Sequence, residues 1–144
     1  MSKSNLSNRE VNTPKHIYVL DAPSLERDRL TRFLEQSSFQ SWVFSTPSAF
    51  FQEKDIHQNI PSVLLSNIEL PNMSGLDILE RIKINQFNMP VIFYGKAQVV
   101  PQGVAAVKQG ALNFLLMPAD EDHILHSIED GLNLSLELQS KSSV

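Results

Sequence analysis

The feature that most constrains the fold is a regular alternation of short apolar runs with helix-like periodicities. The clearest run, SVLLS at 62–66, has no polar residue inside it, as expected for a strand of a parallel sheet that is covered on both faces. Helix-forming patterns separate the runs, so neighbouring strands are joined by crossovers rather than by hairpins. The alternation predicts an α/β domain with a doubly wound, five-stranded parallel sheet and five helices.

The expected strands are rich in β-branched and aromatic residues and end at turn-forming residues. They span 16–20, 41–45, 62–66, 90–94 and 113–117. Residues 23–34 predict a first helix, with Pro23 in its first turn, because proline lacks an N–H that would be unpaired there. A short helix is expected at 47–54, and a small-residue helix at 103–109 ends at Gly110, a natural helix stop.

Two further helices carry clear start signals. Ser74 and Asp77 have the spacing of a capping box, and Leu76, Leu79 and Ile82 are predicted to face inward from the helix that follows. The last helix opens on three acidic residues at 120–122, which favour the positive end of a helix dipole. Its apolar stripe is predicted to pack on the sheet and comprises Ile124, Leu125, Ile128, Leu132 and Leu136.

Size and charge restrict the function classes. The chain has 144 residues, 42% of them hydrophobic, which suits one domain with one core. The net charge of −4 disfavours binding of nucleic acid, and no apolar run is long enough to span a membrane. The chain contains no cysteine, which excludes disulfides and thiol chemistry. We expect a cytoplasmic protein with a disordered tail at 1–14, a domain at 15–131, and a helix extension or linker at 132–144.

The residues that follow the strands are the candidates for function, because ligands of open parallel sheets bind at the carboxyl ends of the strands. These positions are occupied by Asp21 and Ala22, then Asn67, then Tyr94, and finally Met117 and Pro118.

Three stretches around these positions form a recognisable pattern. They are IYVLDA at the first strand, VLLSNIELPNMSGLDILERIK at the third, and AAVKQGALNFLLMP at the fifth. Together they resemble the receiver domain of bacterial two-component response regulators, most closely those that precede a helix-turn-helix output domain. The resemblance covers residues 15–131 and implies a flavodoxin-like sheet with strand order 2-1-3-4-5.

The resemblance also implies a function for each strand-end position, and this chain departs at four of them. Asn67 stands where receivers carry the phosphoacceptor Asp, and Asp21-Ala22 stands where an acidic pair holds Mg²⁺. Tyr94 stands where receivers carry a small hydroxyl residue, and Met117 stands where they carry a lysine that neutralises phosphoryl charge. An amide has no anionic oxygen to attack phosphorus. We therefore expect an atypical pseudo-receiver that is not an enzyme, forms no acyl phosphate and has lost Mg²⁺ binding or retains it only very weakly.

Further expectations follow from the same comparison. The peptide bond before Pro118 is expected to be cis, and Tyr94 is expected to fill the space beside Phe114 and fix one conformation. Receivers pair through their fourth helix, fifth strand and fifth helix, which predicts protein partners and a homodimer. The residues expected in this interface are Val104, Val107, Lys108, Ile124 and Ser127.

Several alternatives stay open at the level of sequence. The favoured function is a phosphorylation-independent interaction and dimerisation module in signal transduction, regulating transcription through a fused or partner output domain. The alternative is a small-ligand sensor that uses the neutral strand-end pocket. The stretch 132–138 could continue as a coiled-coil seam or as a linker helix to a further domain, or it could pack as part of the last helix and then fray. His123 and His126 have the spacing of a metal pair, although a solvated helix face is the simpler interpretation and we expect no metal site.

Overall fold

The computed structural model describes residues 14–54, 56 and 60–142. Five parallel strands form one sheet in the order β2-β1-β3-β6-β7. In chain order they are β1 (His16–Leu20), β2 (Gln40–Phe44), β3 (Ser62–Asn67), β6 (Val91–Gly95) and β7 (Asn113–Leu116). This order confirms the predicted doubly wound sheet. The tail expected at 1–14 lies, except for Pro14, outside the described residues.

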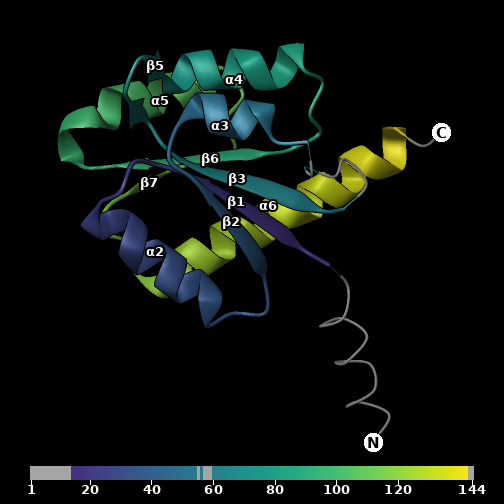
Figure 1. Ribbon diagram of the computed structural model, residues 1–144, viewed down its shortest axis with the longest axis horizontal. Helices are drawn as coiled ribbons and strands as arrows, with labels where there is room; N and C mark the ends of the chain where they lie inside the picture. Colours follow the sequence, from purple (N-terminus) through teal and green to yellow (C-terminus); the bar gives the residue numbers. More distant parts are fainter. Residues whose placement is uncertain (1–13, 55, 57–59, 143–144) are drawn as a thin grey trace, which may run out of the picture.

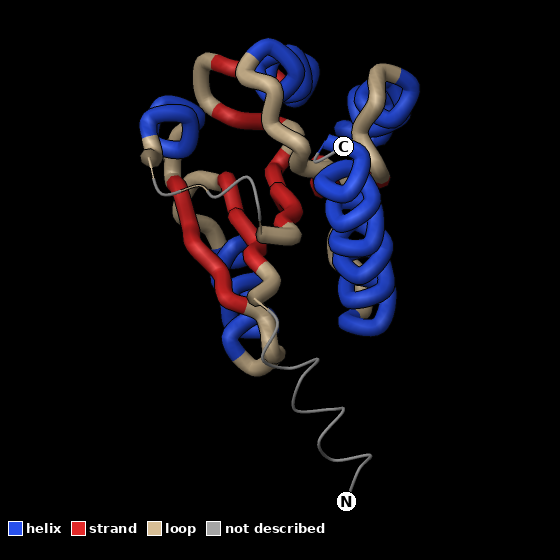
Figure 2. The backbone as a smooth tube through the Cα atoms, turned by 90° about the vertical axis from the view of Figure 1, so that its right-hand side faces the viewer, coloured by secondary structure: helices blue, strands red, loops and turns tan. Residues whose placement is uncertain are grey.

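Helices cover both faces of the sheet (Figure 1). On one face lie α3 (Pro47–Gln52), α4 (Gly75–Ile84) and α5 (Val100–Lys108), with the short helix η1 (Ala97–Val99) before α5. On the other face lie α2 (Leu25–Glu35) and α6 (Glu121–Ser142). Seen from the side in Figure 2, the strands form the inner layer and the helices lie around them.

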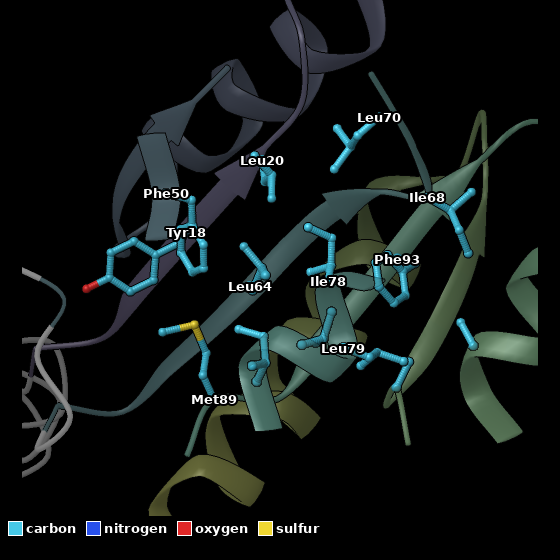
Figure 3. Packing of buried hydrophobic residues seen from close by; sticks show 14 of the residues in the cluster. Tyr18, Leu20, Phe50, Leu64, Ile68, Leu70, Ile78, Leu79, Met89 and Phe93 are labelled. Carbon is cyan, nitrogen blue, oxygen red and sulfur yellow. The ribbon is translucent and has the colours of Figure 1, made fainter. Parts of the chain in front are cut away.

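The two faces of the sheet carry separate halves of the core, because successive strand side chains point to opposite sides. In β1, Tyr18 and Leu20 pack with residues of α3 and α4, whereas Ile17 and Val19 pack with residues of α2 and α6. Figure 3 shows the first of these clusters, in which Phe50 of α3 and Ile78 of α4 lie over side chains of the sheet such as Phe93. All five residues of β1 are buried, which agrees with its central place in the sheet.

Capping residues define where most helices begin. The Ser24 side chain accepts a hydrogen bond from the backbone N–H of Arg27, so Ser24 is the cap of α2. The expected place of Pro23 in the first turn is therefore wrong, because the helix begins two residues later at Leu25. The predicted capping box of α4 is confirmed by two reciprocal bonds between Ser74 and Asp77.

The structure corrects several further details. Leu76 is 43% exposed rather than inward, because Ile78, Leu79 and Ile82 form the buried face of α4. The turn at 70–75 lies in a small antiparallel hairpin of β4 (Glu69–Leu70) and β5 (Met73–Ser74). The small-residue helix starts three residues before Gly103, and β7 ends at Leu116. Strand β6 extends one residue further than predicted, to Gly95.

Helix α6 is long and is attached to the amino-terminal end of β3. Ile124, Ile128 and Leu132 are buried, whereas Leu136 is 49% exposed. One turn past Leu132, the Ser135 hydroxyl accepts a hydrogen bond of 3.0 Å from the backbone N–H of Ser62. The helix thus continues through the expected extension and lies against the start of a central strand. None of the helices in the described part of the chain is long and apolar enough to cross a membrane.

Candidate functional site

The carboxyl ends of β1, β3 and β6 bring Asp21, Asn67 and Tyr94 together. These strands are neighbours in the sheet, and Asn67 is paired in register with Tyr94. Asp21 directly follows β1, and its backbone N–H donates to the carbonyl of Phe44 at the end of β2. Three of the strand-end positions singled out from the sequence thus lie together at the carboxyl end of the sheet.

The polar atoms of this cluster are bonded to one another. Tyr94 donates its hydroxyl proton to Asp21 Oδ2 at 2.8 Å, and Asn67 Nδ2 donates to Asp21 Oδ1 at 3.2 Å. The other end of the Asn67 amide, Oδ1, accepts from the backbone N–H of Glu69 at 2.9 Å. Asp21 is 3% exposed and Tyr94 is 1% exposed. Each carboxylate oxygen of Asp21 therefore has a neutral donor within the protein.

Burial dominates the electrostatics of the cluster. It raises the pKa of the Asp21 carboxyl above its ordinary value, while the hydrogen bonds from Tyr94 and Asn67 and the charge of Arg27 act in the opposite direction. Burial, followed by the nearby charge of Asp21, also raises the pKa of Tyr94 far above its ordinary value. The Tyr94 hydroxyl consequently keeps its proton and remains a donor to Asp21.

Arg27 places a positive charge near Asp21, but its guanidinium bonds the backbone carbonyl of Asp21 and not the side-chain carboxylate. Its Nη1 donates to the Asp21 carbonyl oxygen at 3.0 Å and to Ser45 Oγ at 3.0 Å. The guanidinium thus links α2 to the loops after β1 and β2. It was not among the residues singled out from sequence, because nothing in the pattern of α2 separates Arg27 from its other arginines.

The cluster is a poor match for Mg²⁺. This ion requires several oxygen ligands in a near-octahedral arrangement, usually including carboxylates. Asp21 supplies the single carboxylate here, Ala22 supplies no side-chain oxygen, and Asn67 Oδ1 already accepts from Glu69. Within the described residues no group of three or more His, Cys, Asp or Glu residues could hold a metal ion. On the exposed face of α6, His126 Nε2 lies 3.6 Å from Asp130 Oδ2.

Met117 packs in the same half of the core as Tyr94, between the sheet and the helices α2 and α6. Its side chain is 8% exposed and belongs to the same group of packed residues as Leu30, Tyr94 and Ile124. The bond between Met117 and Pro118 is cis, as expected. The thioether thus occupies buried space between α2 and the start of α6.

Phe114 and Tyr94 lie on opposite faces of the sheet, so the expected packing of one beside the other is wrong. Tyr94 is paired with Leu115, and Phe93 is paired with Phe114. The position that faces the Phe114 ring is Gly95, where an added Cβ would lie 3.5 Å from Phe114 Cε1. Residues that are paired across two strands share a face, and the register pairs Tyr94 with Leu115 rather than with Phe114, so the prediction failed by one residue.

A second glycine completes the slot that holds Phe114. A Cβ added to Gly103 in α5 would lie 2.4 Å from Phe114 Cγ, closer than real atoms approach. Only glycine therefore allows the ring to lie against α5 in this position. A glycine inside a helical pattern often marks such a close approach, and this signal in the sequence could have pointed to Gly103.

The structure divides the expected interface residues into two groups. Val104 and Val107 are 49% and 42% exposed, and Lys108 is also exposed. Ile124 and Ser127 are buried, and Ser127 Oγ accepts a hydrogen bond from Asn113 Nδ2 at 3.2 Å. These two side chains are unavailable to a partner, because they point to the sheet from α6.

Leu116 at the end of β7 is a surface residue that the sequence analysis missed. It is 50% exposed, and it precedes the buried Met117. Alternation along β7 was the available signal, since Leu115 is buried and the next side chain points the other way.

Known proteins share the sequence pattern and the fold of this chain. The family model described as the response regulator receiver domain matches residues 17–129. The transcriptional regulatory protein FixJ of Bradyrhizobium diazoefficiens is 29% identical over 124 residues, covering 83% of this chain and 58% of FixJ. The transcriptional regulatory protein TdiR of Thauera aromatica is 31% identical over 130 residues, covering 88% of this chain and 55% of TdiR.

A solved structure shows the same fold. Full-length FixJ from B. japonicum superposes with a TM-score of 0.76 at 28% identity, covering 83% of this chain and 58% of that protein. This chain thus spans somewhat more than half the length of these relatives. Because the family model matches residues 17–129 and the strand order is that of the same fold, the chain belongs to the response regulator receiver domain family.

Proposed function

We propose that this chain is an atypical receiver domain that acts without phosphorylation, as a protein-interaction and dimerisation module in signal transduction. Through a fused or partner output domain it regulates transcription. The regulatory role rests on relatives such as FixJ and TdiR, which are named as transcriptional regulators and are longer than this chain.

One observation carries the proposal. The residue at the phosphoacceptor position, Asn67, has no nucleophilic oxygen, and both ends of its amide are engaged, one with Asp21 and one with Glu69. Tyr94 engages the remaining oxygen of Asp21. Phosphoryl transfer needs an anionic oxygen in line with phosphorus and a metal ion to neutralise charge. The one carboxylate of this cluster, Asp21, accepts a hydrogen bond on each oxygen, and the cluster lacks the further carboxylates that usually hold Mg²⁺. Its hydrogen bonds favour one fixed arrangement.

The interaction surface is the exposed apolar area of α5 and β7. It comprises Val104 and Val107 on α5 and Leu116 on β7, with Lys108 beside them. Contiguous exposed apolar side chains favour association with another protein surface. Because the close contact of Phe114 in β7 with Gly103 in α5 holds these two elements together, the surface keeps one shape and needs no phosphoryl signal to form.

The test is an amide NMR spectrum of the labelled protein, recorded alone and then with Mg²⁺ and beryllofluoride, a mimic of the phosphoryl group. The isolated receiver domain of FixJ serves as the positive control. We expect large shifts at the strand ends for the control and none for this chain. Intact mass after incubation with acetyl phosphate should likewise show no added phosphoryl group.

A matched variant separates loss of chemistry from loss of fold. Ala22→Asp combined with Asn67→Asp restores three carboxylates at the strand ends and should regain shifts with Mg²⁺. Saturable shifts of Asp21 and Asn67 in the unmodified protein, or a phosphorylated product, would refute the proposal.

The alternative function, a ligand sensor, has less support if the ligand is placed between the strand ends. Tyr94 and Asp21 fill the space between the strand ends and bond each other.

A further inference from the structure

The strand β2 forms one edge of the sheet, with β1 as its neighbour on the inner side (Figure 1). The Gln40 N–H and the Phe44 carbonyl are bonded to residues at the two ends of β1. Because residues of a strand face a given neighbour alternately, Ser41 and Val43 direct their N–H and C=O groups outward. Among the described residues these outward groups form no hydrogen bond.

No feature of β2 protects this edge. Edge strands in natural proteins usually carry a charged residue, a proline or a bulge that prevents another strand from pairing with them. The sequence QSWVF contains neither charge nor proline, and its pairing with β1 is continuous from Gln40 to Phe44. No charged residue occurs anywhere in 36–52. Since Trp42 is 40% exposed and Val43 is exposed as well, the edge is open to a further strand.

A groove of about 600 Å³ borders the same strand, on the face of the sheet that carries α3. Its described lining includes Gln40, Trp42 and Phe44 from β2 and His16 and Tyr18 from β1. The Trp42 ring is stacked on Tyr18, with the ring centroids 5.4 Å apart. Glu53 is the one acidic residue of the described lining, which includes no Lys or Arg. A mainly aromatic surface thus lies beside the unpaired edge.

We propose that β2 binds an extended segment of a partner protein, which pairs antiparallel to it as a sixth strand and places a large apolar side chain opposite Trp42. In this register the residues opposite Ser41 and Val43 exchange hydrogen bonds with them. Paired residues share a face of the sheet, so the side chain opposite Trp42 lies against that ring at the groove. Backbone bonds supply the affinity and the groove supplies the specificity.

A second copy of this chain fits the site less well. In a symmetric pair centred on Trp42, the side chain opposite Trp42 is the Trp42 of the other copy, whose ring is stacked on its own Tyr18. That ring is not available to enter the groove of its partner. The site also uses neither Asn67 nor the surface of α5 and β7, so it is independent of the proposed function.

Hydrogen exchange provides a direct test, with the peptide acetyl-Lys-Thr-Val-Phe-Val-Thr-Lys-amide as the probe. In the free protein, the amides of Ser41 and Val43 should exchange faster than those of Trp42 and Phe44, which face β1. Saturating peptide should slow exchange at Ser41 and Val43 at least about tenfold. Methylation of both valine nitrogens of the peptide, which face β2, should abolish this effect. Methylation of the phenylalanine nitrogen, which faces away, should preserve it.

Two variants of one position separate pairing from fold. Val43→Pro removes an outward N–H but no bond to β1, and proline is tolerated at such edge positions. It should weaken peptide binding at least about tenfold, whereas Val43→Thr, which keeps the N–H and the branched shape, should bind as wild type does. Trp42 is the only tryptophan of the chain, so its fluorescence measures binding, and amide spectra verify that both variants are folded.

Three results would overturn the proposal. They are the absence of a saturable change in Trp42 fluorescence, equal binding of the peptide methylated on its valines, and unchanged binding by folded Val43→Pro. Slow exchange at Ser41 and Val43 that appears without peptide as the protein concentration rises would also overturn it, by assigning the edge to a second copy.

Discussion

At the scale of single residues, the strand-end cluster surrounds one buried carboxylate with neutral donors. The hydrogen-bond partners of the Asp21 carboxylate are Tyr94 and Asn67. A buried charge is costly unless its hydrogen bonds are complete. The two donors offset part of this cost, and the remainder is visible as the raised pKa of Asp21.

Asp21→Asn should therefore reduce the dependence of stability on pH. The folded chain binds the Asp21 proton more tightly than the unfolded chain, so stability is highest below the ordinary pKa of 3.8 and decreases as the pH rises through the folded value. Asparagine carries no charge and avoids this decrease. From pH 3 to pH 7, we expect the free energy of unfolding of the variant to rise relative to wild type in urea titrations.

Tyr94→Phe is the control for that experiment. It removes the hydroxyl that stabilises the Asp21 carboxylate, so at pH 7 it should lower the free energy of unfolding by about 1–3 kcal/mol. Without this hydrogen bond the pKa of folded Asp21 rises further. The decrease in the free energy of unfolding with pH should therefore begin at the same pH as in wild type and continue to a higher pH. A pH profile of Asp21→Asn that parallels wild type would show that Asp21 does not titrate as described.

At the scale of elements, the contact of α5 with β7 depends on glycine. Phe114 lies so close to Gly103 that any side chain there would overlap its ring. Glycine is unfavourable in a helix interior by about 1 kcal/mol relative to alanine, so its place in α5 has a cost in local stability. The close approach of Phe114 offsets that cost.

Gly103→Ala should destabilise the protein by about 1–3 kcal/mol, as overpacking does, although the same change stabilises most helices. Thermal or urea unfolding measures this directly. In a Phe114→Ala background the clash is absent, and Gly103→Ala should then be neutral or stabilising. Destabilisation that is equal in both backgrounds would mean that α5 and β7 do not meet as described.

The elements themselves were largely predictable from sequence, and the failures concern the direction of side chains. Apolar runs and start signals such as Ser74 placed the strands and helices, because burial and capping act locally. The face that Tyr94 shares with residues of β7 depends on the register of the two strands, which apolar content alone does not fix. The burial of Ile124 followed from the apolar stripe of the last helix, whereas that of the polar Ser127 depends on the rotation of α6, which is set by packing against the sheet.

At the scale of the whole molecule, exposed apolar residues are found on both edge strands and α5 as well as on other helices. Val107 and Leu116 belong to the surface of α5 and β7, whereas Trp42 and Val43 lie on β2 at the opposite edge of the sheet. The proposed dimer uses the first area. The second provides an internal comparison of similar exposure.

Val107→Glu should shift a dimer toward monomer at a given concentration, because it places a charge in an apolar contact. Val43→Glu is the matched control, since Val43 is 43% exposed and Val107 is 42% exposed. Sedimentation velocity over a range of concentrations measures both. A monomer at all concentrations in wild type, or equal effects of the two variants, would argue against pairing through α5 and β7.

The hydrogen bond between Ser135 and Ser62 has a practical consequence. It holds the last turns of α6 at the amino-terminal end of β3, and β1 enters the sheet at the same end, with His16 in register with Ser62. The strand-end cluster lies at the carboxyl ends of β1, β3 and β6, which are at the other end of these strands (Figure 1). A fluorophore or a surface anchor attached at Pro14 or Lys141 would therefore lie away from the cluster.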